Sequence, residues 1–384
     1  MNKQKIVILI DWYLPGSKAG GPVRSIYSLI SLIKNYFDIY LITTNYDLGR
    51  TEGYEEITAN KLFKTDEVNY FYFTKDKLNI ENICSEINKI NPHLVYLNSF
   101  WSFNFSIGIV KAKRNNLITA PVLLAPRGML GKGALGLKPL RKTVFIFLSR
   151  LLGWYKKMKF HATNQLEKKD IQSKFKNAEI FTVSNVNSGV PLFTNKDKEI
   201  KQLKLFYLSR ISTVKNLHFA IEILNQIPAD IKIEYDIFGN LEDKNYWEKC
   251  TTLINNLPAN IKVNYKYELP FNEVQNVIIN YHALFLPTLN ENFGHSIVES
   301  LLSGCAAIIS DQTPWNDLEI NNAGFALSLN NKSGFVSAIV NLALLNKEEF
   351  ELKSKASIKY ISSKLNIEES ITQYKNMFHE SISN

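Results

Sequence analysis

Cysteine is scarce in this chain of 384 residues. Its three cysteines, Cys84, Cys250 and Cys305, are an odd number and have no C-x-x-C spacing. The sequence therefore supports neither a disulfide framework nor a thiolate zinc site, and it favours a reducing compartment. Only 17 Gly and 12 Pro are present, while 45% of the residues are hydrophobic. Collagen-like, low-complexity and disordered proteins are excluded, and a globular protein is expected.

Long hydrophobic runs are also absent. The apolar run at residues 6–10 is closed by Asp11, and is too short for the core of a secretory signal. The best candidate for a spanning segment, residues 143–155, contains Arg150 and falls short of the roughly 20 apolar residues that a membrane helix needs. We expect a cytoplasmic protein that does not cross a membrane.

Carboxylates are missing from a long internal stretch. Between Glu86 and Glu167 there is no Asp or Glu, yet there are thirteen Lys and Arg. Residues 1–190 carry 27 basic and 14 acidic side chains (net +13), whereas residues 191–384 carry 18 and 22 (net −4). We expect the first half to meet an anionic partner. Nucleic acid is not expected, because no recognition motif accompanies the charge.

Within this stretch, residues 138–159 combine basic side chains with apolar ones at helical spacing, namely Val144, Phe147, Leu148, Leu151 and Leu152. Such a segment can be an interfacial helix lying on an anionic membrane surface, on the inner face of the cell membrane. It can equally be a core helix whose basic residues are solvated. The sequence leaves both interpretations open.

Strand-length apolar runs alternate with helix-length periodic segments in both halves. The expected strands are residues 6–10, 38–43, 68–73, 94–98, 122–125 and 179–183, then 204–208, 231–238, 261–265, 283–286 and 306–310. This alternation predicts an α/β protein with two doubly wound Rossmann-like domains facing a central cleft. A polar stretch at residues 189–201 places the boundary between domains 1–190 and 191–384, with the last helix a candidate to pack back on the first domain.

Three segments follow expected strand ends. The first is the Gly20-Gly21 loop, which opens a helix containing Arg24; a nicotinamide-type G-x-G-x-x-G is absent, which disfavours a dehydrogenase. The second carries Arg210 and Lys215, two cations that can bind a diphosphate or remain solvated loop charges.

The third segment, residues 286–304, carries Glu291 before an expected helix start at Gly294-His295, and Glu299 inside that helix. The two carboxylates can flank an anion held by the amides of His295, Ser296 and Ile297, which is the layout of a nucleotide sugar. The alternative is that both are ordinary polar residues at a helix start.

Taken together, the Gly20-Gly21 loop, SRISTVKNL and ENFGHSIVE resemble the large retaining GT-B glycosyltransferase family, family 4 (glycosyl transferases group 1). The resemblance implies that Arg210 and Lys215 hold the donor diphosphate, that Glu291 contacts the donor sugar and that Glu299 contacts the ribose. The catalytic candidates are Glu291, Arg210 and Lys215. The donor-binding candidates are Gly20, Gly21, Phe293, Gly294, His295, Ser296, Ile297, Glu299, Tyr267 and Glu268, the last two near the nucleobase.

The sequence departs from that family in one place. Many relatives carry a His on the amino-terminal rim, where this chain reads APRGML with Arg127-Gly128. The candidate contacts for acceptor or sugar are Arg24, Arg127 and His161, although His161 can instead be structural.

No D-x-D occurs, so no metal and no cofactor are expected, and the cations take the place of a divalent ion. The resemblance implies a retaining glycosyltransferase that uses a UDP- or GDP-linked sugar and a glycan or lipid-diphosphate-linked acceptor, in surface polysaccharide or lipopolysaccharide synthesis. The alternatives are a noncatalytic binding protein of this fold and a sugar-nucleotide epimerase.

Overall fold

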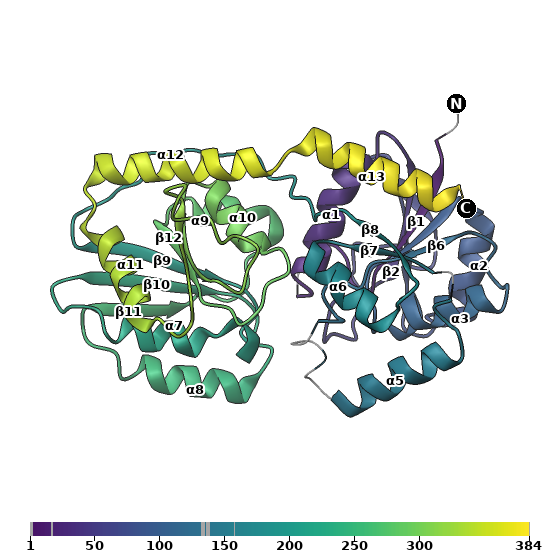
Figure 1. Ribbon diagram of the computed structural model, residues 1–384, viewed down its shortest axis with the longest axis horizontal. Helices are drawn as coiled ribbons and strands as arrows, with labels where there is room; N and C mark the ends of the chain where they lie inside the picture. Colours follow the sequence, from purple (N-terminus) through teal and green to yellow (C-terminus); the bar gives the residue numbers. More distant parts are fainter. Residues whose placement is uncertain (1–2, 17, 132–134, 136–138, 157, 384) are drawn as a thin grey trace. The chain divides into compact units, whose positions relative to one another are not determined.

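The chain divides into two units, each built around its own sheet (Figure 1). The computed structural model describes residues 3–16, 18–131, 135, 139–156 and 158–383. Unit 1 comprises Met1–Ser188 and Ile367–Asn384, and unit 2 comprises Gly189–Asn366. Both sheets are parallel apart from one edge strand of unit 1, so the prediction of two doubly wound α/β units is confirmed.

In the described part of unit 1, eight strands pair in the order β3-β4-β2-β1-β5-β6-β7-β8. The strands are β1 (Lys5–Leu9), β2 (Asp38–Thr44), β3 (Phe63–Thr65), β4 (Val68–Phe73), β5 (Leu94–Leu97), β6 (Val122–Leu124), β7 (Lys159–Ala162) and β8 (Glu179–Thr182). The helices are α1 (Gly21–Ile33), α2 (Ile80–Ile90), α3 (Gly108–Arg114), α5 (Pro139–Leu151), α6 (Gln165–Lys174) and α13 (Ile367–Ile382), with a π-helical turn at Phe103–Ile107.

The apolar run in β1 serves both faces of this sheet. Side chains alternate along a strand, so Ile6 and Ile8 pack in one core cluster with residues of α1 and α13. Val7 and Leu9 pack in the opposite cluster with residues of α2 and α3. A central parallel strand covered on both faces therefore reads as an unbroken apolar run.

The last helix, α13, belongs to unit 1, where it lies beside α1 (Figure 1). The hydroxyl of Tyr374 donates to the carbonyl oxygen of Ser184 at 3.1 Å. The ammonium of Lys159, in β7, donates to the carbonyl oxygen of Glu380 at 2.7 Å. This second bond satisfies a carbonyl group near the end of α13 that has no partner within the helix.

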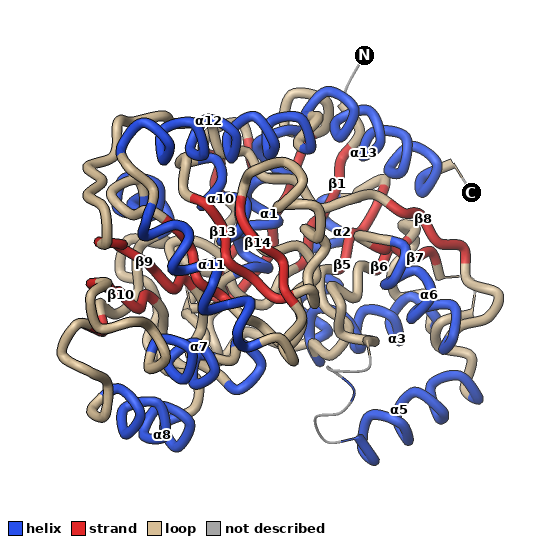
Figure 2. Tube along the Cα trace, turned by 60° about the vertical axis from the view of Figure 1, so that its left-hand side comes forward, coloured by secondary structure: helices blue, strands red, loops and turns tan. Residues whose placement is uncertain are grey.

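In the described part of unit 2, six parallel strands pair in the order β11-β10-β9-β12-β13-β14. They are β9 (Gln202–Leu208), β10 (Lys232–Phe238), β11 (Ile261–Tyr265), β12 (Ala283–Leu286), β13 (Ala306–Ser310) and β14 (Gly324–Leu327). The helices are α7 (Leu217–Leu224), α8 (Lys244–Ile254), α9 (Val274–Ile278), α10 (His295–Leu302), α11 (Lys332–Leu344) and α12 (Lys347–Lys364). Figure 1 shows α12 along one side of this unit and α8 along the opposite side, and the tube in Figure 2 shows the strands between the helical layers.

Three strands were not predicted from the sequence. β3 and β14 are short edge strands of three and four residues, too short to stand out as strand-length apolar runs. β7 reads Lys-Phe-His-Ala, yet all four of its residues are buried. Polar side chains inside a strand lower the apolar signal, and here they are accommodated by specific hydrogen bonds rather than by solvent.

No helix in the described part of the chain is both long and apolar enough to span a membrane.

Candidate functional site

Lys215 and Glu291 meet at the carboxyl edge of the unit 2 sheet. Lys215 lies in a 3-10 turn, Thr213–Lys215, that follows β9, and Glu291 lies in the loop after the neighbouring strand β12. The Lys215 Nζ is 2.5 Å from Glu291 Oε2, and the two side chains are only 12% and 17% exposed. The structure thus joins two residues that the sequence placed in separate segments.

The two loops are held together by hydrogen bonds that the sequence did not reveal. The side chain of Asn216, which has a positive φ of 59°, donates to the Pro287 carbonyl oxygen at 2.9 Å. The Leu289 amide and the Thr288 hydroxyl both donate to the carbonyl oxygen of Val214, at 2.8 and 3.1 Å. Asn adopts positive φ more readily than most residues. The presence of Asn at position 216 was therefore the only feature of the sequence that could have indicated this turn.

Arg210 lies two residues beyond β9 but pairs with a different carboxylate. Its Nη1 is 2.8 Å from Glu242 Oε1, and both side chains are well exposed, at 39% and 45%. Its carbonyl oxygen accepts from the hydroxyl of Tyr207 at 3.0 Å. Arg210 and Lys215 therefore lie in one loop region but have separate carboxylate partners, and Glu242 was not singled out from the sequence.

The loop containing Arg210 comes very close to the end of β10. A Cβ on Gly239 would lie 1.8 Å from the Ser209 carbonyl oxygen, and the φ of Gly239 is 151°. The Ile211 amide donates to the Asn240 carbonyl oxygen at 2.9 Å. Glycine at 239 is therefore needed for the backbone approach that positions the Arg210 loop.

Gly294 fixes the start of α10. Its φ is 81°, and a Cβ there would lie 2.8 Å from Ile297 Cδ1 and 3.1 Å from Glu291 Cγ. No side chain caps α10, and its first turn holds no acidic residue. The amide of Ile297 donates to the Gly294 carbonyl oxygen at 2.9 Å. In this structure the Ile297 amide thus bonds within the helix start, and the expectation that the amides of His295, Ser296 and Ile297 bind an anion stays a prediction.

The residues around the start of α10 are held by aromatic contacts. The carbonyl oxygen of Phe293 accepts from the indole N–H of Trp315 at 2.6 Å. The Phe293 ring lies 4.8 Å from the buried ring of His295 and 5.8 Å from that of Trp315. Glu299 lies within α10, about one turn beyond its first residue, and is half-buried.

Tyr267 and Glu268 follow β11 at the same edge of the sheet. Tyr267 has a positive φ of 61°, and its ring is 70% exposed. It lies 4.6 Å from the ring of Tyr265, which in turn lies 4.9 Å from that of Trp247. Its carbonyl oxygen accepts from the Gly239 amide at 2.8 Å. An exposed ring backed by two others offers a flat surface on which a planar group can stack.

In unit 1, the two glycines before α1, Gly20 and Gly21, differ in whether the backbone conformation requires glycine. Gly20 has a φ of 64°, which favours glycine, and it precedes the first residue of α1. At Gly21 a Cβ would meet nothing within 4 Å and no unusual φ is present. Arg24 lies in the first turn of α1, where its amide donates to the Gly20 carbonyl oxygen at 3.3 Å. Only Gly20 is therefore required by the backbone.

Arg127 follows β6 and bridges the ends of three strands. It has a positive φ of 56°. Its Nη2 donates to Asn98 Oδ1 at 2.7 Å and to the hydroxyl of Tyr96 at 3.0 Å, and its Nη1 donates to Asn185 Oδ1. The following amide, of Gly128, donates to the buried carboxylate of Glu167 at 2.6 Å. Arg127 is thus held in place mainly by neutral acceptors.

His161 has no exposed surface. Its Nδ1 lies 2.6 Å from the Tyr96 hydroxyl and its Nε2 lies 2.7 Å from the Val183 carbonyl oxygen. Burial, together with the nearby charge of Arg127, lowers the pKa of His161 to about 3. The neutral ring therefore donates from Nε2 and accepts at Nδ1. Its position fits the structural interpretation rather than a contact with sugar or acceptor.

Asp11 is a further polar group at the unit 1 edge that the sequence did not single out as a site residue. Its Oδ1 accepts from the Ser102 hydroxyl at 2.6 Å. Burial raises the pKa of Asp11 above its usual value. The carboxyl ends of β1, β5, β6 and β8 therefore carry two hydrogen-bonded groups of polar side chains: Asp11 with Ser102, and Arg127 with Tyr96, Asn98 and Asn185.

Among the described residues, no group of three or more His, Cys, Asp or Glu side chains is placed to hold a metal ion.

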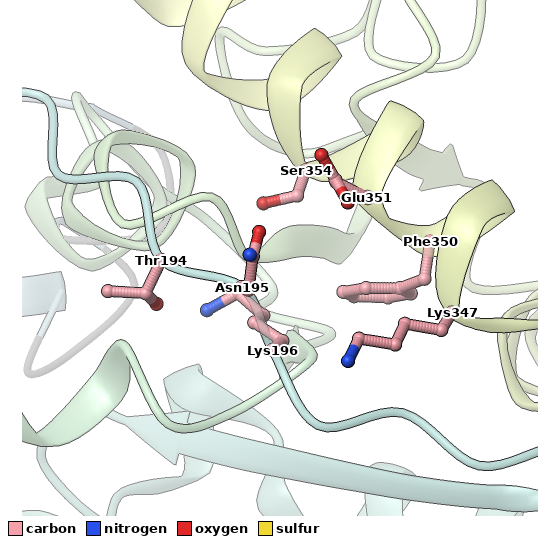
Figure 3. Close-up of a pocket in the computed structure, with 7 residues that line it drawn as sticks. All are labelled: Thr194, Asn195, Lys196, Lys347, Phe350, Glu351 and Ser354. Atoms are coloured by element: carbon pink, nitrogen blue, oxygen red, sulfur yellow. The ribbon is translucent and has the colours of Figure 1, made fainter.

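A small pocket lies where residues 194–196 pass α12 (Figure 3). There Lys196 Nζ donates to the Ile279 carbonyl oxygen at 2.5 Å. None of the candidate site residues lines this pocket.

Part of the chain is similar to a known family model. Residues 192–361 match the model for glycosyl transferases group 1. Comparison with curated proteins gave no match. HepE from Anabaena, solved in complex with UDP and glucose, aligns at a TM-score of 0.69 and 14% identity, covering 98% of this chain and 100% of that chain.

Two further solved structures align over similar lengths. Sucrose-phosphate synthase from Thermosynechococcus elongatus has a TM-score of 0.70 at 11% identity, covering 98% of this chain and 99% of that one. The pneumococcal O-GlcNAc transferase GtfA, in complex with UDP and GlcNAc, has a TM-score of 0.65 at 11% identity, and both chains are covered completely, at 100%. These similarities establish the fold of the chain, which is the GT-B fold.

Proposed function

We propose that the protein is a retaining glycosyltransferase that moves a sugar from a UDP- or GDP-linked donor to a glycan or lipid-diphosphate-linked acceptor. The observation that carries this proposal is the half-buried Lys215–Glu291 pair beside the glycine-started helix α10. The family match over residues 192–361 supports it, since that segment contains both residues. HepE, a protein of the same fold, was solved with UDP and glucose.

Departure of the nucleoside diphosphate leaves negative charge that the protein has to stabilise. Lys215 and Arg210 supply positive charge at the end of β9, and the amides of His295 and Ser296 add the dipole of α10. The ion pair of Arg210 with Glu242 is exposed, and such pairs are worth about 0–1 kcal/mol. An incoming diphosphate can therefore displace Glu242 from Arg210.

Glu291 is proposed to hold the donor sugar. Its bond to Lys215 leaves its second oxygen, Oε1, to accept from sugar hydroxyls. Glu299 is assigned to the ribose hydroxyls, and the exposed ring of Tyr267, with Glu268 beside it, to the nucleobase. In the proposed reaction the acceptor hydroxyl attacks the anomeric carbon from the face that the diphosphate leaves. The anomeric C–O bond breaks, the new one forms, and the hydroxyl proton passes to the leaving diphosphate oxygen.

No metal is required in this scheme, because the two cations take the role of a divalent ion at the diphosphate. We assign the acceptor to unit 1, where Arg24 and Arg127 are the candidate contacts. The first 190 residues carry a net charge of +13, which favours an anionic acceptor such as a lipid diphosphate. The setting that fits such an acceptor is surface polysaccharide synthesis, including lipopolysaccharide, at the cytoplasmic face of the cell membrane.

A thermal-shift screen with UDP, GDP and their sugar conjugates tests the donor class. A ligand at 100 times its dissociation constant stabilises the folded protein by about 2.7 kcal/mol. We expect one nucleotide family to raise the midpoint in the wild type and to lose that effect in Lys215→Ala. The matched control is Lys332→Ala, which removes an exposed lysine paired to Glu222 at 2.8 Å in the same unit.

Turnover assays then separate the transferase from the two alternatives. Release of the nucleoside diphosphate only when an acceptor is added supports the transferase. Conversion of the donor without acceptor indicates an epimerase. Binding without turnover, across a panel of donors and acceptors, indicates a noncatalytic binding protein and contradicts the proposal.

A further inference from the structure

We propose that unit 1 docks on anionic lipid through the outward face of α5. This inference deepens the membrane-side setting of the proposed function, but it uses none of the transferase chemistry. Four of the large apolar residues of α5 that are exposed to solvent form a row: Leu140 (82%), Val144 (54%), Phe147 (63%) and Leu151 (74%). Their spacing of four, three and four residues places them on one face of the helix.

The opposite face of α5 already packs on unit 1. Ile146 and Ser149 are buried, and the ring of Phe145 lies 5.5 Å from that of Trp101 and 5.8 Å from that of Trp154. With about 100° between successive residues, the exposed apolar row points away from this buried row. The core therefore does not use the outer row, and the core-helix interpretation of that row is excluded.

Leu148 and Leu152 widen the exposed apolar row, since they are 46% and 50% exposed. All five apolar residues noted in the sequence thus lie at the surface. Two basic positions of that segment, Lys138 and Lys157, lie outside the described residues.

Basic side chains occur on α5 and on the segments that contact its C-terminal end. Arg141, Arg150 and Lys156 are exposed in α5 and just after it. Two more come from α3: Lys111 Nζ lies 4.2 Å from the centre of a Trp154 ring, and Arg114 Nη1 donates to the Gly153 carbonyl oxygen at 3.0 Å. We refer to Lys111, Arg114, Arg141, Arg150 and Lys156 as the basic collar.

Nothing in the nearby sequence neutralises the collar, because residues 87–166 contain no Asp or Glu. An apolar row that enters the acyl boundary, with cations at the level of the headgroups, is the arrangement that binds anionic bilayers. A second copy of the same face would instead bring one basic collar against another. Charge complementarity therefore favours an anionic lipid surface as the occupant.

Co-sedimentation with vesicles tests the inference on the full chain. The probes are phosphatidylcholine vesicles with and without phosphatidylglycerol, at low and high salt. We expect the wild type to bind the phosphatidylglycerol vesicles at least about tenfold more tightly, with the difference shrinking as salt screens the charges. Equal binding to both kinds of vesicle at low salt would overturn the proposal.

Two pairs of variants separate the apolar row from the collar. Phe147→Ser with Leu151→Ser should lower binding to both kinds of vesicle about tenfold or more. Arg141→Gln with Arg150→Gln should lower binding only where phosphatidylglycerol is present, and should reduce its salt dependence. Each pair replaces exposed side chains, so both variants are expected to keep the wild-type unfolding midpoint.

Matched controls come from the same unit. Leu166→Ser replaces a leucine on α6 that is 67% exposed, and Lys61→Gln with Lys64→Gln removes two exposed charges distant in sequence from α5. Both controls should bind vesicles as the wild type does; equal losses in the controls would overturn the assignment to α5. So would a Phe147→Ser/Leu151→Ser variant that changes only the oligomeric state in gel filtration.

The outcome is separable from the proposed function. Nucleotide binding to unit 2 should be unchanged in the α5 variants, since none of these residues belongs to the donor site. A wild type that binds anionic vesicles but no nucleotide would contradict the transferase and leave the docking surface standing.

Discussion

Lys215 Nζ and Glu291 Oε2 lie 2.5 Å apart although the two residues are 76 positions apart in the sequence. The contact forms because β9 and β12 are neighbours in a parallel sheet, so the loops that leave them meet at one edge. The two charges compensate each other while only 12% and 17% exposed. This pair is the centre of the proposed donor site, and its removal is the first test of that site.

Removing either partner should cost activity far more than fold. Lys215→Ala or Glu291→Ala should lower turnover by about 100- to 1000-fold, the range found when one preorganised group that stabilises a transition state is removed. Steady-state release of the nucleoside diphosphate measures the effect. Lys332→Ala/Glu222→Ala, which removes an exposed pair of the same unit, is the control. Wild-type rates in both site variants would refute the assignment.

Arg210 and Glu242 should have opposite effects on nucleotide binding. Arg210→Ala removes a cation from the diphosphate and should weaken UDP or GDP binding. Glu242→Gln removes the competing carboxylate of an exposed pair and should strengthen binding by up to about fivefold, the equivalent of about 1 kcal/mol. Isothermal titration measures both. Parallel losses in the two variants would show that Glu242 helps the ligand rather than competing with it.

Gly294 and Gly21 should respond differently to alanine. The backbone of Gly294 has a φ of 81°, and a Cβ there would lie 2.8 Å from Ile297 Cδ1. Gly294→Ala should therefore destabilise the protein by about 1–3 kcal/mol. At Gly21 a Cβ meets nothing, and Gly21→Ala should stay within about 0.5 kcal/mol of the wild type. Urea unfolding compares the two, and similar losses would contradict this account of α10.

His161 should make stability depend on pH. Burial and Arg127 lower its folded pKa to about 3, whereas the unfolded chain protonates near 6.5. Below about pH 6.5 the unfolded state binds more protons than the folded state. The free energy of unfolding therefore decreases as the pH is lowered, by up to about 1.4 kcal/mol per pH unit for this one group. His282, in unit 2, adds a slope of the same sign, since burial lowers its pKa to about 4.

The measurement is the free energy of unfolding between pH 7 and pH 5 for the wild type and for His161→Gln. Gln can still donate to the Val183 carbonyl oxygen and accept from Tyr96, but it does not titrate. The variant should show the shallower slope, although it is less stable at pH 7. Identical slopes would mean that His161 is protonated or exposed in the folded protein.

Much of the fold follows from sequence patterns, and the exceptions have local causes. β1, β9 and β12 were predicted because parallel strands covered on both faces read as apolar runs. β7 escaped detection because Lys159 and His161 are polar, and each is buried by a hydrogen bond to a partner remote in the sequence. A single sequence does not identify such partners.

The site shows the same division. The position of Gly294 at a helix start was readable from the sequence, since glycine precedes an apolar periodic segment there. Three contacts could not be predicted from the sequence: the ion pair of Arg210 with Glu242, the hydrogen bond from Asn216 to the Pro287 carbonyl oxygen, and the hydrogen bond from the Gly128 amide to Glu167. Each depends on which strands become neighbours and in what register, and this is fixed only by the packed sheet.

Titration calorimetry of nucleoside diphosphates against the matching monophosphates tests the central claim most directly. The account predicts that UDP or GDP binds the wild type at least about tenfold more tightly than UMP or GMP, because the second phosphate meets Lys215, Arg210 and the start of α10. In Lys215→Ala and Arg210→Ala that preference should shrink, while monophosphate affinity stays near the wild-type value. A preference of undiminished size in both variants, or no nucleotide binding by the wild type, would contradict the account.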